Sequence, residues 1–208
     1  MSAAYPLDEH GVWCELLRPR EGGARPAIFL DRDGTLIELV DYLSRPEQVR
    51  LIVPALALVR AANALDLLVV VITNQSGIGR GYYGWDAFAA VQARLLALLA
   101  EEGCSVDAVM ACPALPDSGA PCRKPNPGML LDAARLLPLD LQASWIVGDS
   151  LIDLQAGKRA GLRRGWLAPT GYGPRDAEAA RALLDAGFDA VLLEPLDLLA
   201  ARLRQAVS

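Results

Sequence analysis

The sequence contains a single histidine, His10, among its 208 residues. A Ser-His-Asp or Cys-His arrangement and a phosphohistidine relay would all depend on this one side chain. A zinc site with two histidine ligands could not form at all. We therefore expect any catalysis to rely on carboxylates, hydroxyls, amides and lysine.

The chain is also poor in basic charge, long apolar runs and cysteine. Its 20 Lys and Arg against 25 Asp and Glu give a net charge of −5, which favours neither nucleic acid nor an anionic membrane as a partner. No apolar run approaches the roughly 18–20 residues that span a membrane. Residues 1–10 lack the basic start and apolar stretch of a secretory signal. Four cysteines in such a chain do not indicate a disulfide framework, so we expect reduced thiols and a cytoplasmic protein.

Apolar residues make up 53% of the chain, which is enough to bury a core. After residue 26, short apolar segments alternate with helical patterns. We expect strands at 27–30, 67–72, 106–111, 144–147, 164–168 and 190–193. We expect helices at 54–65, 85–101, 126–137, 150–160, 175–186 and 195–206. This alternation predicts an α/β fold, a doubly wound parallel sheet in a three-layer sandwich.

The length indicates one domain, at roughly 100–200 residues per domain. Residues 1–26 are rich in proline and glycine, and we expect them to form an irregular N-terminal arm that packs on the core. Trp13 is the expected anchor of this arm. Residues 27–208 are expected to form the single domain. The segments after residues 35 and 128 are too short for a helical subdomain, so we expect no large cap.

Polar side chains follow the predicted strands at their carboxyl ends, where ligands bind in sheets of this kind. Asp31-Arg32-Asp33-Gly34 follows the first strand, and Asp149 follows the fourth. The strand period places Asp31 and Asp33 on the same side, so their carboxylates repel one another. Hard oxygen ligands of this kind suit Mg²⁺ completed by phosphate. An Asp-x-Asp-Gly segment by itself is also typical of a turn with side chain to backbone hydrogen bonds.

A basic pair, Arg123-Lys124, precedes the predicted helix at 126–137. Arginine binds phosphate in a bidentate manner and lysine acts as a compact charge, so the pair suits a phosphate near Asp31. Thr73-Asn74 at a strand end offers a hydroxyl and an amide to phosphate oxygens. Each pattern alone is also typical of a solvated basic loop or a strand-end turn. Their occurrence together, each at a strand end or loop, favours a phosphate site.

The motifs together resemble the haloacid dehalogenase superfamily of phosphatases over residues 27–168. The segments Phe29–Thr35, Thr73–Gly77 and Cys122–Pro125 are similar to the branch of D,D-heptose 1,7-bisphosphate and histidinol-phosphate phosphatases. The resemblance implies a Rossmann-like fold and a Mg²⁺-dependent hydrolase that cleaves a phosphoric monoester through an aspartyl-phosphate. The expected substrate is D-glycero-D-manno-heptose 1,7-bisphosphate, at the 7-phosphate. Histidinol phosphate or a broader set of sugar phosphates is the alternative.

The resemblance also implies a role for each motif residue. Asp31 would be the nucleophile, and Asp33 would protonate the leaving alcohol and then activate water. Thr73 and Lys124 would hold the phosphoryl oxygens. Mg²⁺ would be bound by the Asp31 carboxylate, the Asp33 backbone carbonyl and Asp149. The substrate-contacting positions would be Asp41, Tyr42, Asn74, Gln75, Ser76 and Arg123.

Two features depart from this branch, the zinc loop and Ser150. Its zinc loop carries cysteines and one histidine, whereas only Cys112 and Cys122 remain here, with Ala114 and Ala120 at the other ligand positions. Two thiolates do not fill a tetrahedral zinc site, so we expect two ordinary cysteines and no zinc. Ser150 stands where the heptose phosphatases usually have a lysine within reach of a substrate phosphate.

Asp153 lies one helical turn after Asp149. It is expected either to orient Lys124 or a metal-bound water, or to be an ordinary carboxylate on the helix surface. A phosphorylatable receiver-like signalling domain is the alternative from another class, because it combines Asp, Mg²⁺, Thr and Lys on a similar sheet. Receiver domains lack a second carboxylate two residues after the phosphorylated aspartate. The presence of Asp33 therefore favours an enzyme over a receiver domain. Short loops and acidic charge make a monomer the expected state.

Overall fold

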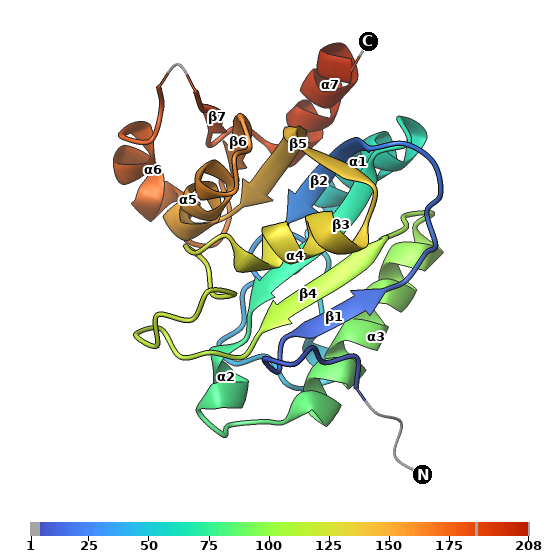
Figure 1. Cartoon of the computed structure of the whole chain (residues 1–208), viewed down its shortest axis with the longest axis vertical. Helices are drawn as coiled ribbons and strands as arrows, with labels where there is room; N and C mark the ends of the chain where they lie inside the picture. Colours follow the sequence, from blue (N-terminus) through green and yellow to red (C-terminus); the bar gives the residue numbers. More distant parts are fainter. Residues whose placement is uncertain (1–4, 186, 208) are drawn as a thin grey trace.

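The computed structural model describes residues 5–185 and 187–207. Its centre is a sheet with the strand order β1-β4-β3-β2-β5-β6-β7 (Figure 1). The strands are β1 Trp13–Leu16, β2 Arg25–Leu30, β3 Leu68–Asn74, β4 Ala108–Cys112, β5 Leu139–Gly148, β6 Arg164–Leu167 and β7 Asp189–Leu192. The helices are α1 Val53–Ala64, α2 Ser76–Gly79, α3 Trp85–Glu101, α4 Gly128–Leu136, α5 Leu151–Arg159, α6 Gly173–Arg181 and α7 Leu196–Val207, with a short 3-10 helix at Pro46–Gln48.

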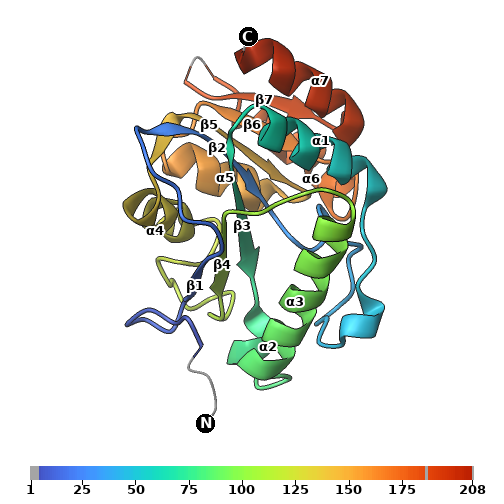
Figure 2. The ribbon, with the colours of Figure 1, turned by 90° about the vertical axis from the view of Figure 1, so that its right-hand side faces the viewer.

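Helices cover both faces of the sheet (Figure 2). Helices α1, α3 and α7 bury their apolar side chains in one hydrophobic cluster against the sheet. Helices α4, α5 and α6 contribute to a second cluster on the other face. The residues of β3 from Leu68 to Thr73 are all buried, as expected of a strand covered on both sides. The predicted three-layer α/β sandwich is confirmed, and no separate cap domain is formed by the described residues.

Strands β2 to β7 run parallel, and β1 is the exception. It pairs antiparallel with β4, with Trp13 opposite Ala111. The prediction of an irregular arm over residues 1–26 is therefore wrong for β1 and for the start of β2. The hydrogen-bond partners of this edge strand lie far away in the sequence, so no local sequence pattern predicts the strand. The division of the chain at residue 26 stays a prediction.

Trp13 anchors this edge strand to the helical layer. Its side chain is buried, and its ring centroid lies 5.1 Å from that of Phe88 and 5.5 Å from that of Trp85. Aromatic pairs at these separations stabilise packing beyond the area that they bury. The predicted anchoring role of Trp13 is therefore borne out by its contacts with α3.

The spatial order of the strands reverses at β2. Strands β3 and β4 lie to one side of it and β5, β6 and β7 to the other. Ligands bind beyond the carboxyl ends of the strands at such a switch point. Asp31 follows β2, Asn74 ends β3 and Asp149 follows β5, so the predicted site residues converge there. Within the described residues, no helix is both long enough and apolar enough to cross a membrane.

Candidate active site

The turn after β2 places Asp31 and Asp33 at the switch point of the sheet. The Asp31 N–H donates to the Val147 carbonyl oxygen at 2.9 Å, which ties the end of β2 to β5. Gly34 has a φ of 89°, in the region that favours glycine. A Cβ at this position would lie 2.3 Å from Asp149 Oδ2. Gly34 thus permits the turn and also leaves room for the third carboxylate.

Three buried carboxylates meet at the end of β2. Asp31, Asp149 and Asp153 each offer an oxygen, and these oxygens lie within 4.8 Å of one another. Burial raises the pKa of Asp31 most strongly, while Lys124 lowers it and Asp153 adds to the rise. Burial and Asp153 raise the pKa of Asp149 to about 7. Hard oxygen donors with unrelieved negative charge fit a Mg²⁺ ion.

Asp153 was not among the predicted metal ligands, although its carboxylate belongs to this cluster. The sequence signal for Asp153 is its spacing of four residues from Asp149. Asp149 follows β5 and Asp153 lies in the first turn of α5, so the two side chains lie close together. Its side chain is buried, which excludes the alternative of an ordinary carboxylate on the helix surface. The Asp33 carboxylate lies outside the cluster, so only its backbone carbonyl is left as a proposed ligand.

Lys124 is a buried cation in contact with this cluster. Its Nζ lies 2.5 Å from Asp31 Oδ1 and 2.7 Å from Asp153 Oδ1, and it donates to the Ile72 carbonyl oxygen at 3.0 Å. Burial disfavours the ammonium, but the carboxylates of Asp153 and Asp31 outweigh this effect and raise the pKa of Lys124 above its usual value. Lys124 is therefore charged at neutral pH, and Asp153 orients it as predicted.

The Asn74 side chain holds the segment that carries Lys124. Its Nδ2 donates to the Lys124 carbonyl oxygen and its Oδ1 accepts the Lys124 N–H, each at 3.1 Å. This reciprocal pair ties the end of β3 to the segment before α4. Asn74 therefore positions Lys124, whereas its predicted contact with substrate stays a prediction.

Asp33 lies beside Thr73 and Gln75 at the end of β3. Its Oδ2 accepts hydrogen bonds from Gln75 Nε2 at 2.9 Å and from Thr73 Oγ1 at 3.2 Å. Gln75 Nε2 also donates to Thr73 Oγ1 at 2.7 Å. The three side chains form one polar group, in which Thr73 is committed to Asp33 and Gln75.

Two adjoining cavities open at the carboxyl ends of the strands. The inner cavity has a volume of about 160 Å³, and its lining includes Asp31, Asp33, Thr73, Lys124, Asp149 and Asp153. The outer cavity has a volume of about 340 Å³, and its lining includes all six predicted substrate positions, Asp41, Tyr42, Asn74, Gln75, Ser76 and Arg123. Asp33, Leu39, Asn74 and Tyr172 line both cavities. The fold thus brings every predicted site residue to two connected spaces.

Residues of the cavities that the sequence reasoning missed include Tyr172, Leu39, Arg32 and Tyr83. The backbone N–H of Tyr172 donates to Asp149 Oδ2 at 2.9 Å. Tyr172 lies between β6 and α6, at the same edge of the sheet as the other site residues. The segment after β6 follows the same rule as the other strand ends, and this is the sequence signal for Tyr172.

Cys112 and Cys122 are joined by a disulfide, with their Cα atoms 5.8 Å apart. The prediction of two ordinary, reduced cysteines is therefore wrong for this pair. The end of β3 brings them together, because the Gln75 N–H donates to the Cys112 carbonyl oxygen and Asn74 binds the backbone of Lys124. Sulfur atoms bonded to each other offer no thiolate to zinc.

Ser150 lines the inner cavity, but its side chain is engaged within the protein. Its Oγ donates to Asp176 Oδ2 at 2.9 Å, and its N–H donates to Asp153 Oδ2 at 3.1 Å. In this arrangement the serine links the start of α5 to α6. Ser150, at the position where the family resemblance led us to expect a lysine, therefore makes a structural contact.

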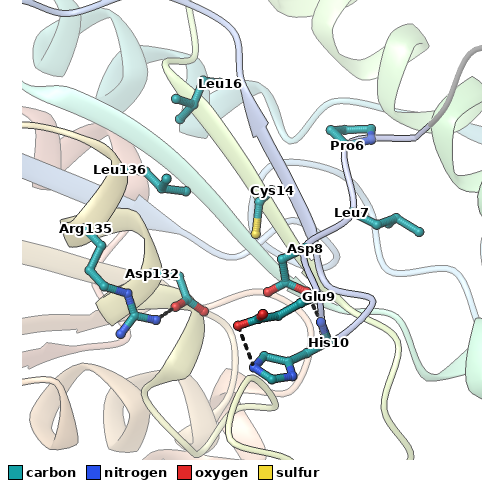
Figure 3. A pocket seen from close by; sticks show the side chains of 10 residues that line it. All are labelled: Pro6, Leu7, Asp8, Glu9, His10, Cys14, Leu16, Asp132, Arg135 and Leu136. Carbon is teal, nitrogen blue, oxygen red and sulfur yellow. Dashed lines mark hydrogen bonds and ion pairs between the residues drawn. The ribbon is translucent and has the colours of Figure 1, made fainter.

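A third cavity of about 530 Å³ lies between residues 6–16 and α4 (Figure 3). It shares no lining residue with the inner or the outer cavity. His10 belongs to this third cavity, where its Nε2 lies 3.6 Å from Glu9 Oε1. The single histidine is thus away from the carboxylate cluster, in agreement with the expectation that catalysis does not use it.

The chain is similar to proteins with known activities. A family model described as HAD-hydrolase-like matches residues 121–191. A D-glycero-beta-D-manno-heptose-1,7-bisphosphate 7-phosphatase of Mesorhizobium japonicum is 49% identical, over 94% of this chain and 94% of that protein. A D-glycero-alpha-D-manno-heptose-1,7-bisphosphate 7-phosphatase of Burkholderia mallei is 40% identical, over 76% of this chain and 87% of that protein.

Solved structures show the same similarity. The crystal structure of a HAD-like phosphatase from Mesorhizobium loti matches with a TM-score of 0.85 and 45% identity, over 98% of both chains. The D,D-heptose 1,7-bisphosphate phosphatase of B. bronchiseptica, complexed with magnesium and phosphate, matches with a TM-score of 0.76 and 38% identity. That match covers 87% of this chain and 99% of the other.

Proposed function

Because this chain belongs to the family of D-glycero-D-manno-heptose 1,7-bisphosphate 7-phosphatases among the HAD-like hydrolases, we propose that it removes the 7-phosphate of that sugar. The observation that carries the proposal is the ion pair between Asp31 and the buried Lys124, both of which line the inner cavity. A nucleophilic carboxylate beside a fixed cation and a cluster of metal-binding oxygens suits phosphoryl transfer. The adjoining outer cavity supplies room for the rest of the substrate.

The reaction would proceed in two displacements at phosphorus. A free Asp31 oxygen forms a bond to phosphorus while the bond to the sugar oxygen breaks, and Asp33 gives that oxygen a proton. In the second step Asp33 takes a proton from water, whose oxygen attacks phosphorus and releases Asp31. Lys124 keeps the Asp31 carboxylate in place through Oδ1 and offsets charge on the phosphoryl oxygens. The Thr73 hydroxyl donates to Asp33 in this structure, and it would bind an equatorial oxygen by turning from Asp33 to the phosphoryl group.

Mg²⁺ is the cofactor of this site. Asp31, Asp149 and Asp153 would hold it, with the Asp33 backbone carbonyl as a further ligand, and the short separation of the three carboxylate groups supports this assignment. When bound, the ion neutralises charge that develops on the phosphoryl oxygens. Burial is the main cause of the raised pKa values of Asp31 and Asp149. The neighbouring carboxylates, whose charge such an ion would compensate, raise these pKa values further.

The outer cavity is the proposed site for the sugar and its second phosphate. Arg123 lines it, and burial lowers the pKa of Arg123, with a smaller contribution in the same direction from the neighbouring Arg80. Tyr42 also lines it, with a φ of 51° that is uncommon for a residue other than glycine. Backbone strain of this kind is frequent at functional sites. Asp41, Gln75 and Ser76 complete the proposed sugar contacts.

The remaining alternatives concern the substrate more than the reaction. Histidinol phosphate or other sugar phosphates would use the same inner cavity and differ only in their contacts with the outer one. A receiver-like signalling domain is not supported by the relatives, which are phosphatases. A monomeric state and a cytoplasmic location stay predictions.

Phosphate release from a panel of substrates tests the proposal. The purified protein with Mg²⁺ should show its highest kcat/KM on heptose 1,7-bisphosphate, compared with histidinol phosphate and common sugar monophosphates. Asp31→Asn should abolish turnover of every substrate, because the amide is not a nucleophile. Absence of phosphate release from the whole panel would refute the proposed function. Preference for histidinol phosphate would refute only the choice of substrate.

A further inference from the structure

The carboxylate of Asp33 is held by side chains from the turn after β2 and from the end of β3. Arg32 binds it in a bidentate manner, with Nε 3.0 Å from Oδ2 and Nη2 3.1 Å from Oδ1. Gln75 and Thr73 donate to Oδ2 from the other side. Arg32 is itself buried, and its guanidinium lies 5.3 Å from the centre of the Phe88 ring. Asp33 is thus held on both sides by groups that are fixed in the fold.

Tyr83 fixes the direction in which the Gln75 amide points. Its hydroxyl donates to Gln75 Oε1 at 2.6 Å, so the amide nitrogen faces Asp33 and Thr73. Burial raises the pKa of Tyr83 to about 12, so the phenol keeps its proton at neutral pH and acts as the donor. Without this donor, the oxygen end of the amide loses its partner, and only the contacts of the nitrogen end with Asp33 and Thr73 orient the amide. The oxygen end would repel the Asp33 carboxylate.

The ring of Tyr83 is itself held in place by the residue below it. A Cβ at Gly77 would lie 2.2 Å from Tyr83 Cε1, so the ring lies directly on the backbone of α2. Tyr83 also packs against the hydrophobic cluster that contains Phe88. The hydroxyl therefore reaches Gln75 from a position that the packing of α2 and α3 determines.

Asp33 lies where the bond to be broken must lie. It lines both the inner cavity, which is proposed to take the phosphoryl group, and the outer cavity, which is proposed to take the sugar. The oxygen that joins the two parts of the substrate would therefore lie at the border between the cavities, where Asp33 is the one carboxylate among the four residues that line both. Proton transfer to that oxygen needs a carboxyl group within hydrogen-bond reach.

We propose that Tyr83 is a positioning residue that, through Gln75, holds Asp33 at the border of the two cavities for proton transfer to the leaving oxygen. The inference rests on the proposed function, since it needs Asp33 to be the acid of that reaction. Among the described residues the Tyr83 hydroxyl donates to Gln75 and not to Asp33, so it acts on the geometry of Asp33 and not on the reacting atoms. A misplacement of a catalytic group by about 1 Å can cost roughly 100-fold in rate.

The dependence of the rate on the leaving group distinguishes positioning of the acid from general damage. The value of kcat/KM covers the steps up to release of the leaving alcohol, and so excludes the later attack by water. A sugar alkoxide or phenolate needs a proton in this step, whereas 4-nitrophenolate is a good leaving group without one. We therefore compare kcat/KM on heptose bisphosphate and phenyl phosphate with kcat/KM on 4-nitrophenyl phosphate.

Tyr83→Phe removes only the hydroxyl and is the test variant. Its kcat/KM should fall about tenfold or more on heptose bisphosphate and phenyl phosphate, and by less than about twofold on 4-nitrophenyl phosphate. Asp33→Asn should show the same selectivity with a larger loss. Tyr82→Phe is the matched control, because Tyr82 is the neighbouring tyrosine and contacts Tyr42 through its ring. This control should keep wild-type ratios for all three substrates.

Gly77→Ala provides a second, independent perturbation, because the added methyl group would displace the Tyr83 ring. It should reproduce the selectivity of Tyr83→Phe. Equal losses on all three substrates, or no loss on any, would overturn the role of Tyr83 while leaving the proposed function intact. A wild-type protein without phosphatase activity would overturn the proposed function and this inference with it. Asp33→Asn without leaving-group selectivity would overturn Asp33 as the acid.

Discussion

At the scale of single residues, the site depends on two glycines, which leave room for Asp149 because they have no side chain. Gly34 and Gly171 both lie against Asp149, and a Cβ at Gly34 or Gly171 would come within 2.3 or 1.7 Å of Asp149 Oδ2. Asp149 therefore keeps its place in the carboxylate cluster because two backbone segments approach it without side chains. The motif Asp-x-Asp-Gly includes the glycine at position 34, but the motif does not indicate that this glycine lies against Asp149.

Gly34→Ala tests this requirement. The substitution should destabilise the fold by about 1–2 kcal/mol through the unfavourable φ and by at least about 1 kcal/mol more through the clash with Asp149. It should also weaken Mg²⁺-dependent activity, because Asp149 is displaced. Urea unfolding and a Mg²⁺ titration of activity measure the two effects.

Gly103→Ala is the matched control for Gly34→Ala. Gly103 has a φ of 69°, and nothing lies within 4 Å of a Cβ built there. It should therefore show the backbone cost alone and the wild-type response to Mg²⁺. If both variants lost the same free energy of unfolding and kept the wild-type Mg²⁺ response, the prediction that Gly34 must leave room for Asp149 would be wrong.

At the scale of elements, the sequence predicted most strands and helices because their patterns are local. The helix at 85–101 was predicted with its observed bounds, since buried Phe88, Val91, Leu95 and Leu99 recur at helical spacing. The strand at 144–147 was predicted too short, because β5 begins at Leu139 and its residues 140–143 are half-buried or exposed, outside the apolar run. The four-residue α2 and the edge strand β1 were missed, because one is very short and the other depends on distant pairing.

The loop between β4 and α4 carries a prediction about thiols. Cys112 and Cys122 are bonded, and Cys14 and Cys104 are free. Thiol titration of the protein, denatured without reductant, should therefore find two reactive groups per chain, and four after reduction. Four thiols before reduction would show that the disulfide does not form in solution.

The same bond should contribute to stability. Closing a loop with a sequence separation of 10 residues restricts the unfolded chain. Replacing both cysteines by serine should therefore cost between about 2 and 4 kcal/mol relative to the oxidised protein. Reduced wild-type protein is the control, and its free energy of unfolding should be close to that of the double variant.

At the scale of the whole molecule, Mg²⁺ binding at the carboxylate cluster would be coupled to folding. Its members come from the segment after β2, the segment after β5 and α5, so they meet only in the folded chain. The pKa of Asp149 is about 7 in the fold, mainly through burial, against about 3.9 for an unperturbed aspartate. The folded state therefore binds more protons than the unfolded state between these two values, and stability falls as the pH rises through this window.

A melting experiment across pH tests this coupling. In EDTA, Tm should fall as the pH rises from about 4 to about 7, because Asp149 must lose its proton in the fold. Saturating Mg²⁺ should raise Tm more at pH 8 than at pH 5, since the ion binds the deprotonated carboxylates. Asp149→Asn should flatten the pH dependence in EDTA and reduce the Mg²⁺ effect. A Tm in EDTA that rises with pH through this range would contradict the assignment.

The sequence by itself determined which reactive groups the protein has and at which strand ends they lie. Asp31, Thr73 and Asp149 follow or end apolar segments, and the geometry of a parallel sheet brings such positions to one edge. Only the tertiary structure decided how these groups pair. The contact of Lys124 with Asp153, the disulfide, and the link from Tyr83 through Gln75 to Asp33 depend on side chains from separate segments. Their distances follow from packing, which no local pattern contains.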